Sequence, residues 1–359
     1  MFGGRSAEHD VSRMTAVAVA RALDPVRYEV IPVAITTEGR WLYAADAAGW
    51  LGEGPQALPE RFEVSGEPVL PPLPSGNSRV ELSSGKGFDV DVVVPLLHGP
   101  YGEDGTVQGL LELADLPYVG SGVLGSAVGM DKVMMKRALL ACGLPIARFI
   151  EMREGHDVEE FCVRVHSELG FPCFVKPANM GSSVGVSKAH DLTQVREAVE
   201  LALVYDEWIV VEEAITGREI EVAVLGDAPP ETSLPGEVVP AGEFYDYLDK
   251  YEKGAAELLV PAPLARHRVA EVRELAVRAF HACRCEAMAR VDFFFDDGEG
   301  GRGFVVNELN TIPGFTPISM YPRLWEVSGL SYPELLDRLI ELALIRHHRR
   351  SRRAGRQRF

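Results

Sequence analysis

Four polar residues toward the end of the chain have the types and spacing of a metal and nucleotide site. Arg290 and Asp292 are two residues apart in one apolar segment, and Glu308 and Asn310 are two apart in the next. Side chains two apart on a strand project to the same face, so we expect all four on one side of a hairpin. Carboxylate and amide oxygens suit Mg²⁺ that bridges nucleotide phosphates. A purely structural ion-paired hairpin is the alternative that these residues leave open.

A second segment has the chemistry of a phosphate site. Lys176 ends an apolar segment and leads into residues 177–185, a loop of small residues that includes Ser182 and Ser183. Backbone N–H groups and hydroxyls donate hydrogen bonds to phosphate oxygens, and a lysine supplies positive charge. An ordinary surface loop with a lysine at its base would have the same sequence, so this segment needs support from the rest of the chain.

Two glutamates flank a short linker that could bind the rest of a nucleotide. Glu212 ends an apolar segment, Glu219 begins the next, and Ala214–Gly217 connects them. Strand ends of this kind can offer backbone groups to the edge of an adenine and carboxylates to a ribose. The two residues are therefore candidates for the nucleoside end of the same ligand.

Two other motifs match known sites but lack the context that those sites need. Gly120–Gly125 matches the dinucleotide pattern GxGxxG, but the strand before it is short and no acidic residue follows about 20 residues on. Gly181–Gly185 matches GxSxG, but its serine is not on a tight strand-to-helix turn. We therefore expect neither a nicotinamide site nor a serine hydrolase. The five cysteines form no CxxC pair and are expected to be reduced thiols without a metal.

Composition narrows the class of protein further. The chain has 359 residues, which at about 150 residues per domain suggests two or three domains. No apolar stretch approaches the roughly 20 residues needed to cross a bilayer, and the N-terminus has no export signal, so we expect a cytoplasmic protein without a membrane partner. A net charge of −17 argues against a nucleic-acid partner. Residues 346–359 contain seven arginines and no acid, and we expect a disordered basic tail there.

Strands and helices of an α/β protein with α+β elements must position these residues. We expect helices at residues 11–23, 106–114, 131–142, 157–169, 192–205, 264–282 and 331–346. We expect strands at residues 28–35, 90–97, 117–119, 171–176, 208–213, 219–225, 286–295 and 303–310. Residues 45–87 are predicted to be irregular, 120–129 a hinge, and 242–260 a functional loop. No strand is predicted before the glycine turn at Gly3–Gly4, so a first strand is expected to be missing.

Taken in order along the chain, these motifs resemble the D-alanine–D-alanine ligases of the ATP-grasp superfamily. The resemblance extends from Gly3 to about residue 345. The segments that carry it are Gly3–His9, His98–Gly105, Met130–Lys132, Lys176–Gly185, Phe244–Tyr251, Ala289–Asp292 and Asn307–Thr316. It implies three domains: an N-terminal α/β domain with a parallel sheet (1–120), a central domain (121–211) and a C-terminal domain (212–345). The last two would clasp a nucleotide, and the basic tail (346–359) would follow.

The resemblance also implies how ATP and metal ions are bound. Lys132 and Lys176 would contact the phosphates while the Ser182–Ser183 loop closes over them, and Glu219 would bind the ribose. Two Mg²⁺ or Mn²⁺ ions would be held by Asp292, Glu308 and Asn310. The remaining nucleotide contacts would come from Glu212, Glu213, Ala214, Ile215, Lys250, Phe294 and Asn307.

The resemblance further implies a carbon–nitrogen ligase that makes D-alanyl-D-alanine for peptidoglycan synthesis and works as a homodimer. The first D-alanine would attack the γ-phosphate, and the amine of the second would then attack the acyl phosphate. The catalytic group would be Glu8, Ser182, Lys250, Tyr251, Arg290 and Gly314. The substrate-binding group would be Glu8, His98, Tyr251, Arg290, Gly314, Ser319 and Met320. Tyr251 stands where ligases that prefer D-lactate carry a histidine, which favours D-alanine as the acceptor.

Three other functions remain open from the sequence. One is an ATP-grasp ligase that uses a different acceptor. Another is a nucleotide-binding regulator without catalysis. The third is an RNA- or surface-binding protein that acts through the arginine-rich end.

Overall fold

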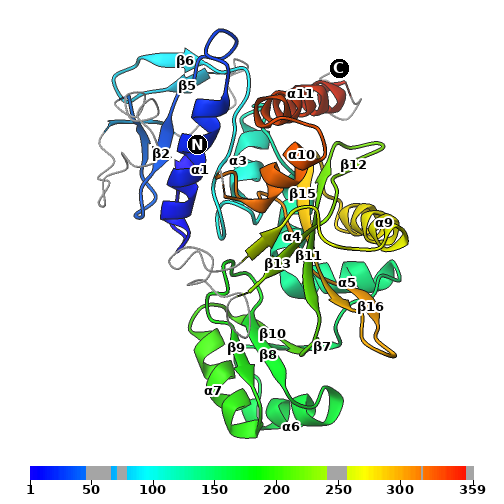
Figure 1. Cartoon of the computed structure of the whole chain (residues 1–359). Coiled ribbons are helices and arrows are strands. Elements are labelled where there is room, and N and C mark those ends of the chain that lie inside the picture. The colour runs from blue at the N-terminus through cyan, green and yellow to red at the C-terminus, as the bar shows by residue number, and fades with distance from the viewer. Residues whose placement is uncertain (46–65, 71–78, 241–256, 317, 353–359) are drawn as a thin grey trace.

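The computed structural model describes residues 1–45, 66–70, 79–240, 257–316 and 318–352 (Figure 1). The helices of this part are α1 (His9–Ala22), α3 (Thr106–Leu113), α4 (Val123–Met130), α5 (Lys132–Ala141), α6 (Val158–Glu168), α7 (Leu192–Leu203), α9 (Arg266–Ala282), α10 (Met320–Val327) and α11 (Tyr332–Ser351). The strands are β1 (Phe2–Gly3), β2 (Val33–Ile35), β3 (Trp41–Tyr43), β4 (Glu67–Pro68), β5 (Arg79–Glu81), β6 (Gly87–Asp89), β7 (Phe149–Arg153), β8 (Cys173–Pro177), β9 (Ser187–Ala189), β10 (Trp208–Glu213), β11 (Arg218–Leu225), β12 (Glu231–Thr232), β13 (Gly236–Val239), β14 (Glu257–Leu259), β15 (Met288–Asp296) and β16 (Gly303–Asn310).

The N-terminal sheet has the strand order β1-β2-β3-β4. β1 is parallel to β2, whereas β3 and β4 add antiparallel strands. The predicted parallel sheet is therefore mixed, because a short turn joins β2 to β3 and only antiparallel neighbours can be joined in that way.

The first strand that we expected to be missing is present, although it is only two residues long. Phe2 pairs with Ala34 on one side and bridges Leu96 on the other. The amino group of Met1 donates to the carbonyl oxygen of Val94 at 2.8 Å. The glycine turn that precedes Glu8 is thus anchored on both sides by backbone hydrogen bonds.

Three predictions in this part of the chain need correction. Residues 90–97 are extended but form only isolated parallel bridges, at Val93 and Leu96, because Pro95 has no N–H to continue a ladder. The expected strand at 117–119 is likewise a single bridge at Tyr118. Within the segment predicted to be irregular, the described residues form β4, β5 and the start of β6.

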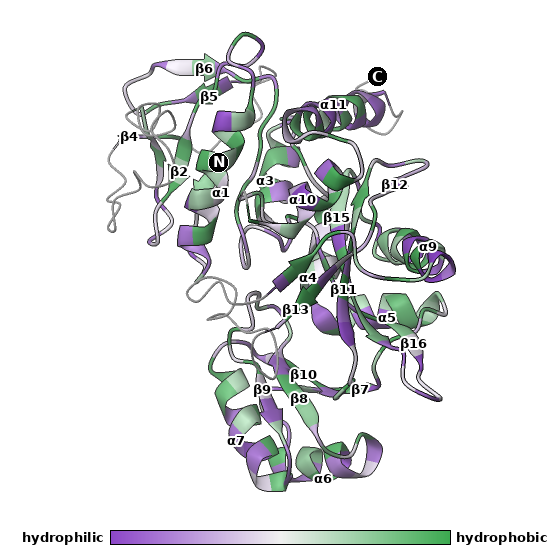
Figure 2. Ribbon diagram, viewed as in Figure 1, coloured by the Kyte–Doolittle hydropathy of each residue, from purple (hydrophilic) through white to green (hydrophobic). Residues whose placement is uncertain are grey.

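Besides the two-stranded sheet of β5 and β6, two larger sheets lie below and beside the first (Figure 1). The central sheet, β7-β10-β8-β9, is antiparallel, and a core that includes residues of α6 and α7 packs on it. The C-terminal sheet has the order β14-β13-β11-β15-β16, with β12 paired to β11. Helix α9 packs against one face of it and presents its hydrophobic side to the strands (Figure 2). Residues of α10, α11 and the N-terminal part form a core with the other face.

The segment predicted to be a hinge contains a helix instead. Residues 123–130 form α4, and the small residues that suggested flexibility allow close packing. A Cβ atom on Gly125 would lie 2.5 Å from the carbonyl oxygen of Arg284. Glycine is required here by the approach of another backbone, which a sequence pattern alone does not distinguish from a hinge.

The described part of the basic tail, residues 346–352, is ordered, although we expected disorder there. Helix α11 continues to Ser351, and Arg346 is buried with its guanidinium donating to the carbonyl oxygens of Tyr118 and Gly120. Arg350 pairs with Glu286 at 2.6 Å. Acceptors that are distant in the sequence therefore bind the charged side chains that predicted disorder. No helix in the described part of the chain is both long and apolar enough to cross a membrane.

Candidate active site

The predicted meeting of four polar side chains on one hairpin is confirmed. In the ladder between β15 and β16, Asp292 lies opposite Glu308 and Arg290 lies opposite Asn310. Arg290 donates to both carboxylate oxygens of Asp292, at 2.7 and 2.6 Å, and the amide of Asn310 lies 3.0 Å from the same carboxylate.

A β-bulge at Asn307 makes this arrangement possible. Asp292 pairs with Glu308 but Phe293 pairs with Val306, so Asn307 has no partner of its own. Strict alternation from Val305, which faces Phe294, would have turned Glu308 to the opposite side of the sheet. The extra residue re-aims the strand so that Glu308 shares the face of Asp292.

Arg290 is held as a permanent cation at this face. Its guanidinium also lies 2.9 Å from the carboxylate of Glu221 on β11. Burial would lower the pKa of Arg290, but the charges of Asp292 and Glu221 outweigh it and raise the pKa well above its ordinary value. Arg290 therefore remains charged at any pH at which the protein is folded.

The oxygen donors on the hairpin fit a metal that is shared with a ligand. Asp292, Glu308 and Asn310 offer hard oxygen atoms from neighbouring strands. Within the described residues, no group of three or more His, Cys, Asp or Glu side chains could hold a metal ion by itself. A cation here would need further oxygens from phosphate groups or water, which is how Mg²⁺ usually binds in nucleotide sites.

A second cluster pairs Glu212 with two lysines. The Glu212 carboxylate on β10 lies 3.1 Å from Lys176 Nζ on β8 and 3.1 Å from Lys136 Nζ on α5. Burial alone would raise the pKa of Glu212, but the charges of Lys136 and Lys176 outweigh it and lower the pKa to about 2. Glu212 is thus ionised and leaves the cluster with one net positive charge for an anionic ligand.

Lys136 was missed by the sequence analysis. Its side chain is fully buried, and burial lowers its pKa against the opposing charge of Glu212. The available signal was its spacing, because residues four apart share one face of a helix and Lys132 was already a candidate. Lys132 itself donates to the carbonyl oxygen of Met180 at 2.5 Å, and burial lowers its pKa too.

Glu213 points away from this cluster. Its carboxylate accepts hydrogen bonds from Arg148, at 2.7 Å, and Arg302, at 2.5 Å, on the opposite face of β10. The prediction that Glu213 lines a nucleotide pocket can therefore apply only to its backbone. Ala214 and Ile215 follow it in the partly buried linker to β11, where Glu219 lies opposite Phe294 of β15.

The glycine-rich loop meets the N-terminal part of the chain at Glu8. The hydroxyl of Ser182 donates to one carboxylate oxygen of Glu8. Cβ atoms added to Gly181 and Gly99 would lie 2.6 and 2.7 Å from the other oxygen, so a side chain at either position would displace the Glu8 carboxylate. Two segments far apart in the sequence, at Gly99 and at Gly181–Ser182, therefore surround the carboxylate of Glu8.

His98 is engaged on both sides of its ring. Nδ1 lies 3.1 Å from the carbonyl oxygen of Ile312, and Nε2 lies 3.2 Å from the hydroxyl of Thr15. Burial lowers the pKa of His98, so the ring is neutral at pH 7. Because a carbonyl only accepts, Nδ1 must carry the proton and Nε2 must accept from Thr15.

Glu103 is a second residue that the sequence analysis did not select. Its carboxylate accepts the N–H of Gly99 at 2.8 Å and the N–H of Ile312 at 3.0 Å. Burial and the negative charge of Glu8 raise the pKa of Glu103 to about 8. Its position within the acidic motif His98–Gly105 was the only signal in the sequence.

The loop after β16 contains Gly314 and Ser319. The hydroxyl of Ser319 accepts from the N–H of Thr316 at 3.0 Å, and a Cβ on Gly314 would lie 2.8 Å from this hydroxyl. Ser319 precedes α10, and Met320 is its buried first residue. The predicted site residues Lys250 and Tyr251 lie outside the described part of the chain.

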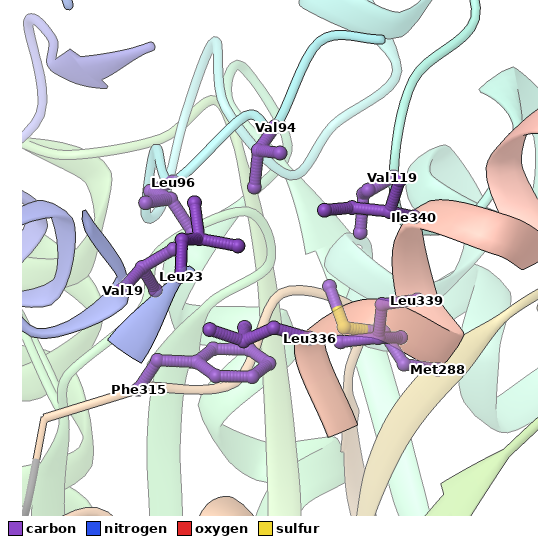
Figure 3. Close-up of a pocket in the computed structure, with 10 residues that line it drawn as sticks. All are labelled: Val19, Leu23, Val94, Leu96, Val119, Met288, Phe315, Leu336, Leu339 and Ile340. Atoms are coloured by element: carbon purple, nitrogen blue, oxygen red, sulfur yellow. The ribbon is translucent and has the colours of Figure 1, made fainter. Parts of the chain in front are cut away.

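The pocket in Figure 3 is separate from these polar groups. It is lined by ten apolar side chains, among them Val19, Met288 and Phe315, and encloses about 10 Å³. That volume is about the minimum for one water molecule, and the lining offers no side-chain polar group to orient a ligand. It is a gap in the packing between α1, α11 and Phe315.

Comparison with known protein families gives two matches that together cover most of the chain. Residues 1–121 match the family described as "D-ala D-ala ligase N-terminus", and residues 138–341 match "D-ala D-ala ligase C-terminus".

Individual proteins give the same result. D-alanine–D-alanine ligases from Geobacillus kaustophilus and Solibacter usitatus are 46% and 47% identical to this chain, over 97% and 98% of it and 94% and 96% of the relatives. The solved D-alanine–D-alanine ligase of Coxiella burnetii superposes with a TM-score of 0.85 at 36% identity, over 98% of this chain and 94% of that one. The VanG D-Ala:D-Ser ligase of Enterococcus faecalis gives a TM-score of 0.83 at 32% identity, over 95% and 97% of the two chains.

Proposed function

The chain belongs to the D-alanine–D-alanine ligase family, and we propose from this premise that it joins two molecules of D-alanine to D-alanyl-D-alanine, with ATP as the driving reactant. The product serves peptidoglycan synthesis in this family. The convergence on Glu8 carries the proposal. A carboxylate from the N-terminal part is bonded by the loop whose composition suits ATP phosphates. An amino-acid ammonium bound by Glu8 would therefore sit beside a polyphosphate.

The nucleotide is proposed to bind between the central and C-terminal sheets. Lys132 and Lys176 contact its phosphates, Ser183 closes over them, and Glu219 binds the ribose. This assignment is supported by the excess positive charge of the lysine cluster, since Glu212 neutralises only one of the two lysines beside it. The remaining contacts are assigned to the backbone of Glu213 and to Ala214, Ile215, Phe294 and Asn307.

We further propose that Asp292, Glu308 and Asn310 hold Mg²⁺ or Mn²⁺ together with those phosphates. When bound, such ions neutralise negative charge on the transferring phosphate. Arg290 stabilises the folded arrangement of the same face, because it fixes the carboxylate of Asp292 through two hydrogen bonds.

In the first step, Glu8 holds the ammonium of the first D-alanine and the carboxylate attacks the γ-phosphorus of ATP. ADP leaves and an acyl phosphate forms. Lysine side chains near the phosphates offset the developing charge, so that positioning and electrostatics supply most of the rate. Lys250 is assigned to the transferring phosphate by resemblance alone.

In the second step, the amine of the second D-alanine attacks the acyl carbon and phosphate leaves. Arg290 and the N–H of Gly314 are proposed to stabilise the tetrahedral oxyanion. Ser319 receives the second carboxylate at the start of α10, where unpaired N–H groups favour an anion. His98 and Met320 complete the substrate site. Ser182 and the loop around it exclude water, which would otherwise hydrolyse the acyl phosphate.

The proposed acceptor is a second molecule of D-alanine. A structure 32% identical to this chain is named as a D-Ala:D-Ser ligase, so the shared fold accommodates more than one acceptor. We assign D-alanine on the basis of Tyr251 and of the curated relatives, which are named for that product. The proposal extends to a homodimer in the cytoplasm that is organised as domains 1–120, 121–211 and 212–345. Sedimentation velocity tests the dimer.

A substrate panel tests the function. The purified protein with ATP and MgCl₂ is given D-alanine, L-alanine, or D-alanine together with D-serine or D-lactate. ADP is measured by a coupled assay and products are identified by mass spectrometry. We expect ADP formation that depends on D-alanine, and D-alanyl-D-alanine as the main product. ATP turnover that is indifferent to D-alanine would refute the proposal, and a mixed product as the main species would change the acceptor.

A further inference from the structure

We propose that Glu103 is a positioning residue that fixes the distance between the two amino-acid sites of the enzyme. The inference rests on the proposed function, because it requires a first site at Glu8 and a second at Gly314 and Ser319. Glu103 belongs to neither site. It acts through the backbone of the two loops between which it lies.

The loop that contains Glu103 is attached to the first site. Ser6 lies two residues before Glu8, and its hydroxyl donates to the carbonyl oxygen of His98 at 2.6 Å. The backbone of Gly99 approaches the Glu8 carboxylate so closely that a side chain there would collide with it. If the loop that contains His98–Glu103 shifts, the position of the Glu8 carboxylate would therefore change as well.

The same loop grips the backbone of Ile312. Glu103 accepts the N–H of Ile312 at 3.0 Å, and His98 donates to its carbonyl oxygen at 3.1 Å. The N–H and the carbonyl oxygen of this buried residue are thus both hydrogen-bonded to side chains of the loop from His98 to Glu103. The second oxygen of Glu103 accepts the N–H of its own loop at Gly99, which fixes the direction of the carboxylate.

The two hydrogen bonds to Ile312 also restrict the position of Gly314. The residue between them is Pro313, whose ring fixes φ and which has no N–H. The next backbone donor after the N–H of Ile312 is therefore the N–H of Gly314, the proposed oxyanion donor. The carboxyl group of Glu103 holds Ile312 and so sets where that N–H points relative to the amino acid at Glu8.

A shift of the second amino-acid site relative to the first has a specific consequence. The acyl phosphate forms at the first site before the second amine attacks it, so a shifted acceptor leaves the acyl phosphate exposed for longer. Water then competes with the amine, and ATP is consumed without dipeptide. A loop that had only a structural role would lower the amount of folded enzyme without changing this ratio.

The neighbouring residue provides a matched control. Asp104 also accepts two backbone N–H groups, from Tyr101 at 2.8 Å and from Thr106 at 2.9 Å. Tyr101 lies in the same loop, and Thr106 is the first residue of α3, so neither bond reaches the segment that contains Ile312. Asp104→Asn therefore removes a bond of the same chemical type from the same loop but leaves the link to Ile312 intact.

The test compares Glu103→Gln with Asp104→Asn by steady-state kinetics, with ADP and D-alanyl-D-alanine measured in the same samples. A displacement of about 1 Å in a reacting group can cost on the order of 10²-fold. We expect Glu103→Gln to lower kcat for the dipeptide at least about 10-fold. The KM for ATP should stay unchanged, and more than one ADP should form per dipeptide. Asp104→Asn should form one ADP per dipeptide.

Two results would overturn the inference. One is a Glu103→Gln enzyme that matches the wild type in kcat and in the ratio of ADP to dipeptide. The other is an equal change in both variants, which would mean general damage to the loop. If Glu103→Gln does not fold, Glu103→Asp replaces it, because the shorter side chain cannot reach both N–H groups, and full coupling in that variant would equally overturn the inference. A wild type that makes no dipeptide refutes the proposed function instead.

Discussion

Replacement of Glu212 by glutamine should be among the most costly single changes in this protein. Its carboxylate lies 3.1 Å from the ammonium groups of both Lys136 and Lys176, and Lys136 is fully buried. A pKa of about 2 in place of 4.5 corresponds to about 3 kcal/mol of stability at neutral pH. Removal of one partner from a buried ion pair costs roughly 3–5 kcal/mol in other proteins, which agrees with this figure.

The pH dependence has a defined sign. Because the pKa of Glu212 is lower in the folded state than the ordinary 4.5, its contribution is fully present above pH 4.5 and is lost as the pH falls toward about 2. Urea unfolding of the wild type and of Glu212→Gln, followed by circular dichroism, measures the difference. We expect about 3 kcal/mol at pH 7 and a smaller difference below pH 4.5.

Glu213 is the matched control for this experiment. It follows Glu212 on β10, but its carboxylate pairs with Arg148 and Arg302, whose side chains are 60% and 42% exposed. Surface ion pairs contribute about 0–1 kcal/mol each, so Glu213→Gln should cost much less. Equal losses in the two variants, or a loss below about 1 kcal/mol for Glu212→Gln, would refute the reasoning about the lysine cluster.

Three further predictions follow from individual contacts. Arg290→Ala should lower kcat by about 10²–10³-fold, the usual effect of losing an oxyanion donor. A near-normal kcat in steady-state assays would contradict that role. Gly181→Ala would place a methyl group 2.6 Å from the Glu8 carboxylate; we expect the KM for D-alanine to rise about 10-fold with the KM for ATP unchanged, and the opposite pattern would contradict the site. Arg346→Met should lower the free energy of unfolding by about 3 kcal/mol, because two backbone carbonyls lose their donor. The exposed Arg352→Met is its control, and an equal effect of the two would contradict the structural role.

The hairpin shows what could be predicted from the sequence and what could not. Alternation along β15 and β16 correctly placed Arg290 with Asp292 and Glu308 with Asn310 on a shared face. The bulge at Asn307 was not predictable, because a strand with one extra residue has the same local composition as a regular one. The prediction succeeded because it treated each pair separately.

Long-range partners account for most of the remaining differences. The basic residues from Arg346 onward were predicted to be disordered from their charge. The acceptors of Arg346, at Tyr118 and Gly120, and of Arg350, at Glu286, are far away in the sequence. Lysine is a residue type that is usually exposed on a helix, and only the packing of α5 against β10 buries Lys136 beside Glu212. Local patterns contain no record of such contacts, so a resemblance or a structure is needed to find them.

The central claim is that a D-alanine carboxylate attacks ATP to form an acyl phosphate, and oxygen labelling tests it most directly. D-alanine labelled with ¹⁸O in both carboxylate oxygens is incubated with the enzyme, ATP and MgCl₂ in unlabelled water, and the inorganic phosphate is analysed by mass spectrometry. If the carboxylate oxygen becomes the bridge to phosphorus, each phosphate released with dipeptide should contain one ¹⁸O. Dipeptide formation with unlabelled phosphate would contradict the account.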